Sequence, residues 1–171
     1  MPVNPPPARH PEVSSPDAGA AAGERDALQL WLRLLACSTQ LETEVRRRLR
    51  ARFQVTLSRF DYMAQLYRYP EGLRMNELSR HLMVTGGNVT GLTDELEKLG
   101  WVQRHTAAAD RRACVLTLTA QGRNRFEGMA REHEAWVTEL LGGLRAAERR
   151  LLHDLLGRLR ETVALRTGEP P

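Results

Sequence analysis

The chain has 171 residues, which suits one domain or one domain with an extension. Apolar residues make up 42% of it, and the net charge of +4 is compatible with an acidic partner such as nucleic acid without selecting one. No apolar run approaches the ~18 residues of a membrane span, and no secretory signal is visible at the N-terminus. The two cysteines do not make a disulfide framework. We therefore expect a cytoplasmic protein with no membrane partner.

The N-terminal part divides into a tail and a helix. Residues 1–23 hold six of the nine prolines together with Ala, Ser and Gly, a composition that predicts a disordered tail. Apolar residues then recur at helical spacing from near Glu24 to about residue 53, which predicts a long helix. They are Leu28, Trp31, Leu35, Leu41, Val45, Leu49 and Phe53. Five arginines in its last two turns indicate a solvated face near the helix C-terminus, with attraction to DNA phosphates as the alternative.

Three shorter helices follow. Ser58 is a suitable N-cap for a helix over residues 59–69, which stops before a proline. After a short extended piece at residues 73–75, Asn76 can cap a second helix, which directs its leucines inward. A third helix opens at Thr85. Its inward residues are Val89, Leu92, Leu96 and Leu99.

A hairpin comes next in the sequence. Gly100 ends the third helix, and two strand-like runs follow at residues 101–105 and 114–118. Residues 107–110 are too small and polar for a core, so they predict a loop between the strands. The tip of that loop carries Asp110, Arg111 and Arg112.

Two helices close the chain. Thr119 can cap the first, Gly142 and Gly143 weaken its end, and the second starts near Ala146. The first has an apolar stripe of Phe126, Met129 or Ala130, His133, Trp136 or Val137, Leu140 and Leu144. The second carries Leu151, Leu152, Leu155, Leu156, Leu159 and Val163. The outer helices present more apolar surface than one small winged domain covers, so a second copy of the chain is the expected partner.

This order of elements predicts a mainly α protein with a small β-wing, in which a winged helix-turn-helix is flanked by dimerisation helices. The expected divisions are a tail at 1–23, an N-terminal dimerisation helix at 24–57, a DNA-binding domain at 58–118 and C-terminal dimerisation helices at 119–167.

The outer face of the helix that opens at Thr85 offers groups that could read DNA. Side chains near a helix N-terminus can reach base edges in the major groove, where Asn88 can bond adenine and the Thr90 methyl could touch thymine. Gly86 and Gly87 each cost roughly 1 kcal/mol in a helix relative to Ala, which suggests that the backbone comes close to a partner such as phosphate. The alternative is a loose helix start without a ligand.

The hairpin offers a second contact with DNA. An arginine at a hairpin tip can enter the narrow, negative minor groove, and Arg112 is our candidate for it. Asp110 can hold the Arg112 guanidinium by a charged fork, while Arg111 and Arg104 would lie toward phosphates. Asp-Arg-Arg alone is usually just a polar turn, so its place after a helix-turn-helix is what makes it informative.

Five segments and one glycine follow one another in a recognisable order. They are Glu77-Leu78-Ser79, Asn88-Val89-Thr90-Gly91-Leu92-Thr93-Asp94-Glu95-Leu96-Glu97, Gly100-Trp101-Val102-Gln103-Arg104, Asp110-Arg111-Arg112, Leu116-Thr117-Leu118-Thr119 and Gly122. With the helices around it, this pattern resembles the MarR family of winged-helix regulators over about residues 25–165.

The resemblance implies a homodimer that binds a pseudo-palindromic operator in double-stranded DNA and usually represses nearby genes until a small molecule lowers its affinity. It assigns the family's wing Asp and Arg to Asp110 and Arg112. The opening Thr85-Gly86-Gly87 departs from the family pattern, because relatives often have larger polar residues there.

The resemblance also implies an effector site between the dimerisation helices and the winged domain, often for an aromatic acid or a phenolic. The candidate residues are Trp31, Arg59 as the anion partner, Phe60, Tyr62, Met63 and Tyr67, and core packing is the favoured alternative for each. Residues 59–97 also resemble the branch that regulates aromatic-acid catabolism, which makes an acyl-CoA thioester a candidate effector. Redox sensing through Cys37 or Cys114 is another family option, although a structural cysteine is favoured.

Two other classes of function compete with DNA binding. The five histidines are scattered without metal-ligand spacing, and no phosphate loop, serine nucleophile elbow or carboxylate pair is visible. We therefore expect no enzyme activity, no metal and no cofactor. The second alternative is a winged-helix protein-interaction module that does not bind DNA.

Overall fold

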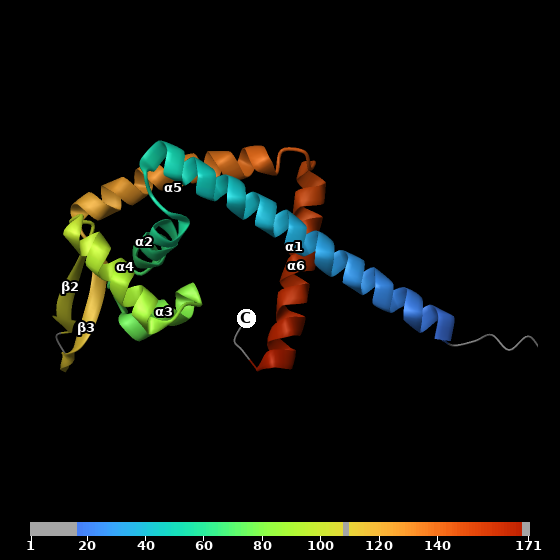
Figure 1. Ribbon diagram of the computed structural model, residues 1–171, viewed down its shortest axis with the longest axis horizontal. Helices are drawn as coiled ribbons and strands as arrows, with labels where there is room; N and C mark the ends of the chain where they lie inside the picture. The colour runs from blue at the N-terminus through green and yellow to red at the C-terminus, as the bar shows by residue number, and fades with distance from the viewer. Residues whose placement is uncertain (1–16, 108–109, 169–171) are drawn as a thin grey trace, which may run out of the picture. The chain divides into compact units, whose positions relative to one another are not determined.

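Six helices and a three-stranded antiparallel sheet make up the described residues of the computed structural model (Figure 1). The structure describes the backbone of residues 17–107 and 110–168, and the side chains of residues 23–105 and 114–168. No helix within these ranges is long and apolar enough to cross a membrane. The predicted fold class, mainly α with a small β-wing, is confirmed.

Helix α1 runs from Asp17 to Phe53, and the chain divides within it into two units, Met1–Gln40 and Leu41–Pro171. The predicted helix start near Glu24 was wrong, because residues 17–23 are also helical. This stretch holds four alanines, the best helix formers, which outweigh its glycines. Residues 1–16 of the predicted tail lie outside the described residues. In the first unit the predicted apolar stripe is exposed, whereas Val45 and Leu49 in the second unit are buried.

Helix α2, Leu57–Arg68, lies at the centre of the core of the second unit. The predicted cap Ser58 was wrong: Thr56 caps the helix instead, because its hydroxyl accepts a hydrogen bond from the Arg59 backbone N–H at 3.3 Å. The ring of Phe60 on α2 packs against Phe126 and His133 of α5, with ring centres 5.3 and 4.8 Å away. This aromatic contact joins α2 to the long helix that follows the sheet.

Strand β1, Leu73–Arg74, leads directly into helix α3, Met75–Leu82. The predicted cap Asn76 was wrong, because it lies inside α3 while the Glu77 carboxylate accepts a hydrogen bond from the Arg74 backbone N–H at 2.7 Å. Met83 ends the helix in the left-handed conformation, at φ 53°. The Ser79 hydroxyl then donates to the Val84 carbonyl at 2.5 Å and fixes the turn. This turn sets the direction of helix α4, Gly86–Lys98.

Strands β2, Val102–Ala107, and β3, Asp110–Leu118, form the hairpin beside α4 (Figure 1). Strand β1 pairs with the other edge of β3. The predicted strands were too short, and the predicted loop at 107–110 is partly strand, since Ala107 pairs with Asp110. A register shift between Thr106 and Ala107 accompanies this pairing. Because backbone pairing continues beyond the apolar residues, the pattern of apolar side chains alone could not show the full length of the hairpin.

Helix α5, Ala120–Leu140, is tied to the base of the hairpin. As predicted, Thr119 caps it by accepting a hydrogen bond from the Gly122 N–H at 3.0 Å. A Cβ at Gly122 would lie 1.9 Å from the Trp101 carbonyl oxygen, so only glycine permits this close approach. Gly100, at φ +71°, ends α4 in the left-handed conformation, as its sequence position predicted.

Helix α6, Ala146–Thr167, begins where predicted. Unlike the other helices of the second unit, it contributes no buried side chain among the described residues. Its predicted apolar residues are all exposed, with exposed fractions from 38% at Leu156 to 60% at Leu151. Such a face on a folded chain is typical of a protein interface.

Candidate nucleic-acid interface

The N-terminus of α4 is an open end of a helix. Thr85, Gly86, Gly87, Asn88 and Thr90 are all exposed there. The Thr85 side chain makes no capping hydrogen bond, whereas Thr56 and Thr119 cap α2 and α5. The first N–H groups of a helix have no partner inside it, and the helix dipole adds partial positive charge at that end. The end of α4 can therefore accept an anion such as a phosphate.

No contact within the described residues requires glycine at the three glycine positions of α4. A Cβ built on Gly86, Gly87 or Gly91 would meet no atom within 4 Å, and none of these glycines has a positive φ. Packing within the chain and backbone conformation would therefore both permit alanine, a better helix former. An external partner that approaches the backbone closely would explain their presence.

The structure defines the orientation of Thr90 on α4 and of Leu99, which follows that helix. The Thr90 hydroxyl donates to the Gly86 carbonyl at 3.1 Å, which fixes its rotamer on the exposed surface of the first turn. Leu99, predicted to face inward, is 43% exposed, so that prediction was wrong. Leu99 follows the last residue of α4, where the chain turns toward Gly100. Beyond the end of the helix, the 3.6-residue spacing no longer predicts which side chains face inward.

Thr93 is a buried residue of α4 that the sequence analysis missed. It is fully buried, and its hydroxyl lies 2.6 Å from the hydroxyl of Tyr62 on α2. The position could have been found, since Thr93 lies four residues after Val89 and three before Leu96, on the inward face of the helix. Its polar side chain concealed this pattern.

Arg104, predicted to lie toward phosphates, forms ion pairs within the chain. Its guanidinium on β2 lies 2.5 Å from Asp94 and 3.0 Å from Glu97, both on α4. The Arg104 backbone N–H also donates to Glu97, at 3.1 Å. The hydrogen bond to Asp94 raises the pKa of Arg104 above its ordinary value. These contacts join the base of the hairpin to the helix, so in the absence of DNA Arg104 positions the hairpin.

The other residues predicted for the wing are at the start of β3. The backbones of Asp110, Arg111 and Arg112 belong to that strand, next to the turn of the hairpin. Their side chains lie outside the described residues. The charged fork between Asp110 and Arg112, and the contacts of all three residues with DNA, therefore remain predictions.

The arginines near the end of α1 are largely paired with carboxylates. Arg48 contacts Glu44 of its own helix and Glu139 of α5, each at 2.7 Å. Arg52 contacts Glu132 of α5 at 2.9 Å. Hydrogen bonds from Arg47 and Arg48 lower the pKa of Glu44 to about 2. These ion pairs favour the predicted solvated face over the alternative of attraction to DNA.

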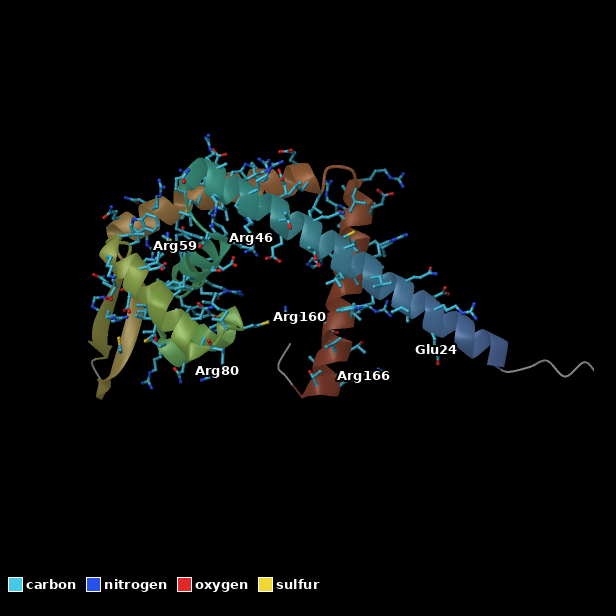
Figure 2. The ribbon with its side chains drawn as sticks, in the orientation of Figure 1. Glu24, Arg46, Arg59, Arg80, Arg160 and Arg166 are labelled. Atoms are coloured by element: carbon cyan, nitrogen blue, oxygen red, sulfur yellow. The ribbon has the colours of Figure 1, made fainter. Side chains whose placement is uncertain are left out.

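All of the predicted effector residues except Trp31 lie on α2. Phe60, Tyr62 and Met63 are buried in the core, as the packing alternative expects. The Tyr67 hydroxyl donates to Glu127 on α5 at 3.1 Å. The guanidinium of Arg59, which Figure 2 labels, pairs with Glu95 on α4 at 2.8 Å. Trp31 belongs to the first unit and is 58% exposed. An effector site at these residues remains a prediction.

The remaining reactive side chains are dispersed. No group of three His, Cys, Asp or Glu side chains that could hold a metal occurs among the described residues. Cys37 is exposed on α1, and Cys114 is half-buried on β3. His133 is half-buried against Phe60, and burial lowers its pKa. His133 is thus part of the aromatic contact between α2 and α5.

Comparison with known proteins places this geometry in a family. A sequence model described as the MarR family matches residues 53–113. The crystal structure of a MarR family transcriptional regulator from Silicibacter pomeroyi superposes with a TM-score of 0.70 at 30% identity, over 82% of this chain and 96% of that one. The chain belongs to the MarR family.

Other relatives and similar structures agree with this assignment. The uncharacterized HTH-type transcriptional regulator YdgJ of Bacillus subtilis is 33% identical over 64% of this chain, and the alignment spans just under two thirds of that relative, 66%. The transcriptional activatory protein BadR of Rhodopseudomonas palustris is 31% identical over 74% of this chain and 73% of its own. Sco3205 of Streptomyces coelicolor, a MarR family transcriptional regulator crystallised with DNA, has the same fold, with a TM-score of 0.71 at 22% identity over 81% of this chain and 88% of that one. The protein is thus a transcriptional regulator of the MarR family.

Proposed function

We propose that this MarR family regulator binds a pseudo-palindromic operator in double-stranded DNA as a homodimer and represses transcription until a small molecule lowers its affinity for DNA. The observation that carries the proposal is the open N-terminus of α4, with exposed Thr85, Asn88 and Thr90 and two glycines that nothing inside the chain requires. In this proposal α4 lies in the major groove, where these side chains contact bases and phosphates. The crystal structure of Sco3205 with DNA supports DNA as the partner.

The hairpin is the second contact with DNA in this proposal. Arg112 enters the minor groove and Asp110 holds its guanidinium, while Arg111 and Arg104 contact DNA phosphates. To bind a phosphate, Arg104 would have to leave its ion pairs, because Asp94 and Glu97 hold its guanidinium in the free chain. We propose that its main part is to position the hairpin beside α4, and that its contribution to phosphate binding is secondary.

Dimerisation is supported by exposed apolar surface in both units. Leu28, Trp31 and Leu35 in the first unit are 48–58% exposed. In the second unit α6 exposes its apolar residues along the whole helix. Burial of such side chains in an interface would gain about 25 cal/mol per Å² of apolar surface, so a second copy of the chain is the economical partner. In the dimer the two α4 helices would be about 34 Å apart, one turn of DNA.

The effector is proposed from the family resemblance. An aromatic acid or its acyl-CoA thioester would bind near α2 and lower the affinity for DNA. Redox regulation through a cysteine is the alternative, and exposed Cys37 is the better placed of the two thiols for it. BadR is described as an activatory protein, so activation instead of repression is the alternative sign of regulation.

The test is selection of bound sequences from random and genomic DNA by the full-length protein. The expected result is a pseudo-palindrome whose affinity falls steeply with salt, because each phosphate contact releases counterions. Aromatic acids and their CoA esters, and separately an oxidant such as hydrogen peroxide, are then screened for release of the DNA. A protein without affinity for any duplex at low salt would instead be a protein-interaction module, and the proposal would be wrong.

A further inference from the structure

We infer that Tyr62 is a positioning residue for DNA recognition, because its hydroxyl holds the first turns of α4 in one orientation from inside the core. The inference rests on the proposed function, in which α4 reads the operator. Tyr62 lies on α2, on the opposite side of α4 from the exposed surface, and would not touch DNA.

Two hydroxyl groups form a chain of hydrogen bonds that ends at the backbone of α4. The Thr93 hydroxyl donates to the Val89 carbonyl at 2.7 Å, and the hydroxyl of Tyr62 lies 2.6 Å from the same Thr93 oxygen. A threonine hydroxyl has one proton, so Tyr62 must be the donor to Thr93. Burial raises the pKa of Tyr62 to about 12, which keeps the phenol protonated. All three residues are fully buried, so water does not compete for these bonds.

The chain of bonds ends next to the candidate DNA-reading residues. Val89 lies between Asn88 and Thr90, so its backbone orientation determines where their side chains point. One residue along a helix corresponds to a rotation of about 100°. A small rotation of α4 about its axis would therefore turn Asn88 and Thr90 away from the base edges that they are proposed to read.

Apolar packing alone would fix this rotation poorly. The contact of α2 with α4 through side chains such as Val89 and Leu96 is non-directional, whereas a hydrogen bond between two buried hydroxyls has one geometry. The Arg59–Glu95 ion pair is a second link between the same helices, but it lies at the surface, where such pairs contribute little. A buried hydroxyl without a hydrogen-bond partner lowers the stability of the fold, so the bond between Tyr62 and Thr93 should be kept in the folded protein.

The test compares binding to the selected operator with binding to an unrelated duplex, at one salt concentration, for the full-length protein. Tyr62→Phe removes the hydroxyl, and Thr93→Val removes its partner with little change of shape. Each should lower the ratio of specific to non-specific affinity by roughly three- to tenfold, the effect of one net hydrogen bond. The double variant should lose no more than either single variant, because both remove the same bond. Non-specific affinity and its salt slope should not change, since they depend on phosphates.

Two control variants separate positioning from stability. Tyr69→Phe makes the same chemical change at a half-buried tyrosine beyond α2, and Leu49→Val destabilises the core from α1, outside the hydrogen-bond chain. Both should keep the ratio of the wild type, although Leu49→Val should lower the melting temperature. Melting temperatures of all variants are measured without DNA.

The outcomes distinguish the inference from the function on which it rests. A wild type that selects an operator, with Tyr62→Phe and Thr93→Val keeping its specificity ratio, overturns the positioning role alone. A loss of ratio in Leu49→Val as large as in Tyr62→Phe also overturns it, because general destabilisation would then explain the effect. A wild type with no affinity for any duplex overturns the proposed function, and the inference with it.

Discussion

Replacement of Gly87 by alanine should raise the stability of the protein and lower its affinity for the operator. Gly87 lies in the first turn of α4, where a Cβ would meet no atom within 4 Å and φ is not positive. Alanine is more favourable than glycine in a helix by up to about 1 kcal/mol. For a chain of this length, that corresponds to a rise in melting temperature of roughly 2–4 °C.

The loss of affinity follows from the proposed approach of the helix end to DNA. A hydrogen bond from a backbone N–H to a phosphate contributes about 1.5–3 kcal/mol, since its acceptor is charged. A side chain that keeps the phosphate away from the Gly87 backbone would therefore weaken binding roughly 10- to 100-fold. Gly87→Leu should have the larger effect, because its side chain extends further into the space that the DNA occupies.

Melting temperature is measured by circular dichroism without DNA, and operator affinity by fluorescence anisotropy at fixed salt. Gly128→Ala is the matched control, because a Cβ on Gly128 of α5 would also meet no atom within 4 Å and this glycine is far in sequence from α4. It should gain a similar stability and keep the affinity of the wild type. If Gly87→Ala and Gly87→Leu bind the operator as tightly as the wild type, Gly87 is not at the DNA contact and the reasoning from the glycines fails.

Three further predictions test the hairpin, the dimer and the turn. Arg112→Ala should lower affinity for the operator and for A·T-rich duplex about tenfold while the dimer stays intact in sedimentation; unchanged binding would remove the minor-groove contact. Leu155→Arg should shift sedimentation toward the monomer, because it places a charge on the exposed apolar face of α6, whereas His153→Arg should stay dimeric; a wild-type monomer would contradict the reasoning. Met83→Gly should raise the free energy of unfolding in urea by about 0.5–1 kcal/mol, since Met83 is 93% exposed and left-handed at φ 53°, and a decrease would show that its side chain contributes packing.

The sequence by itself determined the order of the elements and those ends of helices that depend on local chemistry. Gly100 ends α4 and Thr119 caps α5, because a left-handed residue and a capping hydroxyl act on backbone groups within a few residues. The helical period also identified most of the core, including Leu49, Leu78 and Met129. The cap of α2 was predicted wrongly as Ser58, because Thr56, two residues earlier, takes that position.

The tertiary structure decided which partner each polar side chain takes. Arg104 was predicted to contact DNA, but within the free chain it binds Asp94 and Glu97, and Thr93 is buried against Tyr62. Tyr62 and Thr93 are 31 residues apart in the sequence, and no local pattern connects them. Hydrogen bonds and ion pairs act only over a few ångströms, so they depend on where the folded chain places each group, whereas hydrophobic periodicity is already present in the unfolded sequence.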